Sequence, residues 1–147
     1  MSQHMSQSLE SYLGKYGWDF VKKTEKRIIT GWQGDNRSYP LTIETSDTWV
    51  SFKVKPFLNL NIDWDSWPEI AVQLMEINDS TSMVKLSIDP DGNIVLGLDV
   101  FLSDLNYDRF SEALGVVGHY TELLYDEFLT VLDNIGYRYC ESLNILA

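Results

Sequence analysis

Cysteine and histidine, the residues that most often hold structural metals, are almost missing from this sequence. It has one cysteine, Cys140, and two histidines, His4 and His119. A single cysteine excludes a disulfide within the chain, and these three residues cannot complete the four-ligand set of a structural zinc site. We therefore expect no metal and no cofactor. A chain of 147 residues buries roughly 70% of its unfolded surface, so its core needs no such support.

Basic residues are also scarce, because 11 lysines and arginines stand against 22 aspartates and glutamates. The formal net charge of -11 repels phosphate backbones and anionic membranes, so neither nucleic acid nor a membrane is an expected partner. An acidic surface that keeps the protein soluble is the simplest interpretation of this charge. A basic partner and mimicry of nucleic acid are the alternatives.

Long apolar runs are missing as well, since no apolar run reaches 18 residues. The first ten residues are polar and have neither a basic segment nor an apolar core. We therefore expect neither a transmembrane helix nor a signal peptide, and we expect a cytoplasmic protein.

Turn residues divide the chain into segments with helical or alternating patterns. The first helix is expected from Ser8 to near Lys23, although Gly14 and Gly17 weaken it. Ser66 and Glu69 have capping-box spacing for a short helix, and Asn106 is placed to cap the last one. The expected strands cover 27–32, 39–45, 49–57, 83–89 and 93–101, and the expected later helices cover 66–78 and 106–135.

This order, α-β-β-β-α-β-β-α, predicts an α+β fold with an antiparallel five-stranded sheet and helices packed on one face. We expect a single domain over residues 1–147, with residues 1–6 disordered. Period-two alternation divides the strand residues between two faces. The polar face is expected to carry Thr42, Glu44, Ser51, Lys53, Lys55 and Lys85. The buried face is expected to carry Val50, Phe52, Val54, Leu86, Leu96 and Leu98.

Motifs that carry chemistry are absent from the sequence. The segment Asp89 to Asn93 begins like a calcium loop, but its glycine and its distal ligand position do not fit, and a hairpin turn explains it. His119 lies within a helical pattern with no nucleophile motif near it, and no glycine-rich phosphate loop occurs. We therefore predict no catalytic, cofactor-binding or metal-binding residue, and a protein that is not an enzyme.

A loop rich in tryptophan and aspartate is the candidate binding loop: Asp63, Trp64, Asp65 and Trp67. Two acids between indole rings could bind a cation or act as a carboxylate pair. The alternative is structural, with Asp65 or Ser66 capping the next helix and the indoles packing against the core.

The last helix has more apolar residues than one buried face requires. One seam runs through Phe110, Leu114, Val117, Thr121, Leu124, Phe128, Val131 and Ile135. Six further residues form a candidate dimer interface: Val116, Tyr120, Leu123, Tyr125, Leu129 and Leu132. The alternative is that the first helix and the tail from Tyr137 to Ala147 cover them within one chain.

The element order over roughly residues 6 to 136 resembles the YbjN family, whose fold is that of type III secretion chaperones. The resemblance comprises the first helix, three strands ending in Trp49 to Phe57, a short helix around Ile70 to Ile77, the hairpin at Asp91-Gly92-Asn93 and the long last helix. The tryptophan-rich segment 61–67 departs from the family's pattern. The resemblance implies a non-enzymatic homodimer that binds a segment of another protein or regulates a signalling pathway.

Two functions follow from these observations. The first is a protein-binding module, a chaperone-like or regulatory homodimer that holds an extended or helical segment of a client protein. The alternative is a small-molecule-binding domain, with or without catalysis, whose pocket lies between the sheet and the helices. Its lining would include tyrosines, tryptophans, Asp63 and Asp65.

Overall fold

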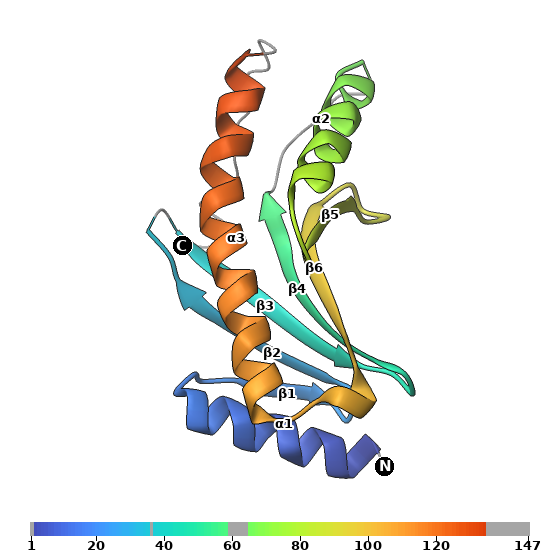
Figure 1. Cartoon of the computed structure of the whole chain (residues 1–147), viewed down its shortest axis with the longest axis vertical. Coiled ribbons are helices and arrows are strands. Elements are labelled where there is room, and N and C mark those ends of the chain that lie inside the picture. The colour runs from blue at the N-terminus through green and yellow to red at the C-terminus, as the bar shows by residue number, and fades with distance from the viewer. Residues whose placement is uncertain (1, 36, 59–64, 135–147) are drawn as a thin grey trace.

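The computed structural model describes residues 2–35, 37–58 and 65–134 of the chain (Figure 1). Its helices are α1 (Ser2–Tyr16), α2 (Trp67–Ser80) and α3 (Tyr107–Asn134), with a short 3-10 helix η1 (Leu102–Asp104). Its strands are β1 (Val21–Thr24), β2 (Arg27–Gln33), β3 (Ser38–Thr45), β4 (Trp49–Leu58), β5 (Lys85–Ile88) and β6 (Ile94–Phe101). They form one antiparallel sheet in the order β1-β2-β3-β4-β6-β5. The predicted α+β class is confirmed.

The sheet has six strands, so the prediction of five strands is wrong, because it omitted β1. The first helix ends at Tyr16, because Gly17 takes a φ of +94°, a left-handed conformation that stops an α-helix. The carbonyl of Leu13 accepts hydrogen bonds from the N–H groups of Gly17 (2.9 Å) and Trp18 (3.1 Å). The residues that follow pair with β2 as an edge strand. The helix also starts earlier than predicted, and residues 2–6 lie in α1.

The remaining helices and strands lie close to their predicted bounds. The predicted capping box of α2 is wrong, because Ser66 is its N-cap but makes no side-chain capping hydrogen bond, whereas the β5–β6 turn and the start of α3 have the predicted chemistry. Gly92 closes the β5–β6 turn with a φ of +85°, and the Asp89 N–H donates to the Asn93 carbonyl at 3.0 Å. At the start of α3 the Arg109 N–H donates to Asn106 Oδ1 at 2.9 Å, which makes Asn106 the predicted N-cap.

The predicted division of the sheet into two faces is confirmed by burial. The six predicted core residues of the strands are buried, whereas Glu44, Lys55 and Lys85 are exposed on the opposite face. In Figure 1, α3 passes in front of β2 and β3, with β4 and β6 to its right, and α1 lies across the lower end of α3. Helix α3 contacts β4, β6 and α1. Aromatic contacts join these layers, because the Phe110 ring lies 5.9 Å from Phe52 and 5.5 Å from Tyr12.

The side chain of Asn78 closes part of the free edge of β5. Its Nδ2 donates to the Leu86 carbonyl (3.0 Å), and its Oδ1 accepts from the Leu86 N–H (2.7 Å). The amide thus bonds both outward-facing backbone groups of Leu86, as a neighbouring strand would. It also fixes α2 beside β5.

We expect Asn78→Ala to lower the free energy of unfolding by about 1–3 kcal/mol, because two partly buried backbone groups lose their partner. Urea denaturation measures this change. Asp79→Ala, at the exposed next position of α2, is the matched control and should change stability by less than about 0.5 kcal/mol. Equal stability of the Asn78→Ala variant and the control would contradict the edge-closing role.

The carboxylate of Asp89 organises the β5–β6 turn. It accepts hydrogen bonds from the N–H groups of Asp91 and Asn93 (both 2.9 Å) and from Asn93 Nδ2 (3.2 Å), and it lies 3.4 Å from Lys55 Nζ. Burial raises the pKa of Asp89, but these hydrogen bonds outweigh it and hold the pKa below its ordinary value.

A lowered pKa means that the ionised Asp89 stabilises the fold above its unfolded pKa of about 3.9, and that this contribution is lost as the pH falls through the folded value. We expect Asp89→Asn to lower the free energy of unfolding by about 1–2 kcal/mol near pH 7. The difference from wild type should shrink below about pH 4. Urea denaturation at both pH values, with Asp91→Asn as an exposed control, tests this; a difference that does not change with pH would refute it.

Candidate functional site

The six predicted interface residues of α3 do not share one surface. Tyr125 and Leu132 are buried in the core of the chain itself. Val116, Tyr120 and Leu129 are half-buried and pack against that core, and Leu123 is exposed over 49% of its surface. The prediction of one interface formed by all six residues is therefore wrong.

Packing against β3 and β4 explains why Tyr125 is buried. Its ring lies 6.0 Å from the ring of Tyr39 and 6.4 Å from that of Phe57, both in edge-to-face geometry. The core thus occupies a wider sector of α3 than the predicted seam, because the twisted sheet follows the helix round its circumference.

The predicted binding loop is only partly described. Asp63 and Trp64 lie outside the described residues, and Asp65 is exposed. Trp67 is the first residue of α2, is half-buried and packs against the core. It also lines a hollow of about 630 Å³ between α2 and the β5–β6 turn. The other residues that line this hollow are Pro68, Ala71, Ile88, Asp89, Pro90, Asp91 and Gly92.

The outward side of α2 continues this hollow as an exposed apolar surface. Val72 is exposed over 53% of its surface and Met75 over 72%, and Ile88 of β5 over 42%. Pro68, Val72 and Met75 follow one another at spacings of four and three, so they lie on one side of the helix. We call this set the α2 surface: Trp67, Pro68, Ala71, Val72, Met75 and Ile88.

A second surface lies where β6 leaves the sheet. The rings of Trp49 and Phe101 stack with centroids 4.5 Å apart on the face opposite the helices. Both are large and solvent-exposed, as is Met83, which holds a φ of +71° that is strained for any residue other than glycine. They border a groove of about 680 Å³, here called the β6 groove. Its lining is Trp49, Met83, Asp99, Val100, Phe101, Ser103, Asp104, Leu105, Asn106, Arg109, Glu112 and Ala113.

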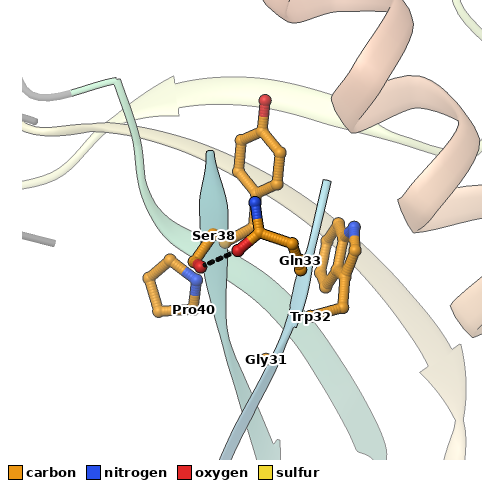
Figure 2. Close-up of a pocket in the computed structure, with 6 residues that line it drawn as sticks. Gly31, Trp32, Gln33, Ser38 and Pro40 are labelled. Atoms are coloured by element: carbon orange, nitrogen blue, oxygen red, sulfur yellow. Dashed lines mark hydrogen bonds between the residues drawn. The ribbon is translucent and has the colours of Figure 1, made fainter. Parts of the chain in front are cut away.

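A third hollow, of about 400 Å³, lies on the β2–β3 hairpin (Figure 2). Gly31 and Pro40 form its floor, and the Ser38 hydroxyl donates to Gln33 Oε1 at 2.6 Å across the two strands. Gly31 is required there, because a Cβ at this position would lie 2.6 Å from the Tyr39 carbonyl oxygen. The described residues that line this hollow include no acid, lysine or histidine, and Tyr39 is the side chain there that could transfer a proton.

Metal-ligand side chains do not cluster in the described part of the chain. Among those residues, no three histidine, cysteine or acidic side chains gather closely enough to hold a metal. His119 is exposed and its ring lies 5.3 Å from that of Tyr120, whereas Cys140 lies outside the described residues. None of the described helices has both the length and the apolar character needed to cross a membrane.

The sequence analysis missed Trp49, Phe101 and Met83. A signal was present for the two aromatics, because each stands beside an inward-facing valine and therefore falls on the polar side of its strand. Met83 gave no comparable signal, since its left-handed backbone depends on where the chain leaves the sheet.

These features define the class of the protein: a small α+β domain with groups of exposed apolar side chains on α2 and along β6, besides the exposed Val21 of β1 and Leu123 of α3. The chain matches the YbjN family model over residues 6–130 and belongs to that family, described as "Putative bacterial sensory transduction regulator".

Six chains of solved structures also match. One of these is the crystal structure of YbjN, "a putative transcription regulator from E. coli", at 15% identity and a TM-score of 0.59. The match covers 88% of this chain and 92% of that one, and it shows that the two share a fold. No curated protein matches the chain at a significant level.

Proposed function

We propose that this chain is a non-enzymatic regulatory module that works as a homodimer and binds a segment of a client protein. The observation that carries the proposal is the α2 surface, where Val72 and Met75 are more than half exposed on a helix whose other side is anchored in the core. A contiguous apolar surface of this kind is typical of protein contacts. The regulatory description of the family supports the same class of function.

The small-molecule alternative has less support. Phe52, Phe110 and Phe128 are all buried and fill the space between the sheet and α3, where that pocket was expected. The hollows described above open instead at the hairpin, at α2 and at β6. We therefore do not propose a ligand pocket between the sheet and the helices.

The α2 surface is also the favoured place for a second subunit. On α3 the exposed apolar residue among the predicted interface positions is Leu123, whereas α2 presents Val72 and Met75 next to Ile88 of β5. An isologous dimer needs one self-complementary patch on each chain, and the longer apolar stripe of α2 provides it.

Light scattering during gel filtration tests the homodimer. The wild-type chain should have twice its monomer mass of 16.9 kDa, and the double variant Val72→Glu/Met75→Glu should have the monomer mass. Both side chains are largely exposed, so the substitutions should leave the fold intact.

Leu123→Glu on α3 is the matched control and should remain a dimer. A wild-type mass equal to that of the monomer, unchanged on concentrating the sample, would contradict the homodimer. Dissociation by Leu123→Glu but not by the α2 variant would instead move the interface to α3.

A further inference from the structure

Strand β6 is paired along only half of the edge that faces β5. The β5–β6 ladder runs from Ile88↔Ile94 to Lys85↔Gly97 and ends there, whereas β6 continues to Phe101. The chain that precedes β5 turns away at Met83, whose left-handed backbone is incompatible with an extended strand. Among the residues that the structure describes, nothing pairs with the second half of β6 on the side that faces β5, which is therefore an open edge.

Ladder geometry identifies the backbone groups at this open edge. Asn78 bonds the N–H and the carbonyl of Leu86, so those two groups point away from β6. Hydrogen-bonded and non-hydrogen-bonded pairs alternate along an antiparallel ladder, so the next pair, Lys85 and Gly97, is a hydrogen-bonded one. On the other side of β6 the Leu102 N–H donates to the Thr48 carbonyl at 2.8 Å. The backbone N–H and carbonyl groups of the even-numbered residues of β6 therefore face β4. The N–H and carbonyl of Asp99 and the N–H of Phe101 therefore point outward.

These outward groups lie in the β6 groove, which has the other components of a binding site. The stacked Trp49–Phe101 pair and Met83 form an apolar shelf on one side of the edge. Three carboxylates and one guanidinium line the groove: Asp99, Asp104, Glu112 and Arg109. Lys85 Nζ lies 3.7 Å from Asp99 Oδ2, and Arg109 Nη1 lies 3.3 Å from Glu112 Oε1, so these five groups carry a formal charge of -1 and Asp104 is the acid outside the two ion pairs. Unpaired strand backbone, apolar side chains and negative charge define the chemistry of the occupant.

We propose that the β6 groove binds an extended segment of a client protein as an added strand, and that this segment carries an apolar side chain beside a lysine or arginine. The inference rests on the proposed client-binding function and assigns its site. The segment lies in line with β5, exchanges backbone hydrogen bonds with Asp99 and Phe101, and places its apolar residue on the Trp49–Phe101 shelf. Its cation lies near Asp104, the groove carboxylate outside the two ion pairs.

A pair of substitutions at Phe101 separates backbone pairing from side-chain packing. Phe101 has a φ of -60°, which proline adopts without strain, and its N–H points away from β4. Phe101→Pro therefore removes the ring and the outward N–H, whereas Phe101→Ala removes the ring alone. Circular dichroism and urea denaturation establish that both variants are folded.

The probe is a library of random peptides displayed on phage and selected on the immobilised full-length chain. The selected peptides should carry an apolar residue next to lysine or arginine. They should bind Phe101→Pro about tenfold more weakly than Phe101→Ala, the effect of one lost backbone hydrogen bond. In the NMR spectrum of the wild-type chain, a selected peptide should shift the amide signals of Asp99 and Phe101.

Equal affinity of the two variants, without shifts at Asp99 and Phe101, would overturn strand addition. Peptides that lose affinity for Val72→Glu/Met75→Glu and keep it for Phe101→Pro would place the client on the α2 surface; the proposed function would then stand and this inference would fall. A library from which no peptide is selected would count against both.

Discussion

The difference in length between β5 and β6 is the constraint on which the accessible surface of this protein depends. Strand β5 has four residues and β6 has eight, so the outer edge of the sheet is half closed. Where β5 is present, Asn78 closes part of its free edge at Leu86 and holds α2 beside it. Where β5 is absent, Met83 turns away and leaves the groove that Trp49 and Phe101 border. The α2 surface and the β6 groove thus lie at the closed and the open halves of the same sheet edge.

The interior of the molecule explains why these surfaces can be rigid. Helix α3 contributes Phe110, Val117 and Phe128 to a core that also contains the inward residues of β3, β4 and β6. The Glu122 carboxylate accepts a hydrogen bond from the Asp35 N–H at 3.2 Å, so the tip of the β2–β3 hairpin is held against α3 as well. A frame fixed in this way presents α2 and the open half of β6 without rearrangement, which lowers the entropy lost on binding. The α2 surface and the β6 groove share no residue, so a homodimer and a bound client segment are compatible.

Much of the fold could be predicted from sequence because local chemistry specifies it. Alternation placed the core residues of β4 and β6, Asn106 capped the last helix, and Pro90-Asp91-Gly92 made the hairpin turn. Strand β1 was missed because its four residues are all exposed and carry no alternation, although Gly17 marked the helix end before it. The candidate site was harder to predict. Helical periodicity could not show that Tyr125 and Leu132 are buried, since the width of the buried sector depends on the twist of the sheet. The β6 groove depends on where β5 stops, and neighbouring residues alone do not fix that point.

Amide hydrogen exchange of the free protein tests the half-open edge most directly, because it compares residues within a single strand. The account predicts that the Val100 amide, which faces β4, and the Leu86 amide, which Asn78 covers, exchange slowly. The amides of Asp99 and Phe101 should exchange much faster, although Val100 lies between them. Protection of Asp99 and Phe101 equal to that of Val100 would mean that this edge is already closed, and the account would be wrong.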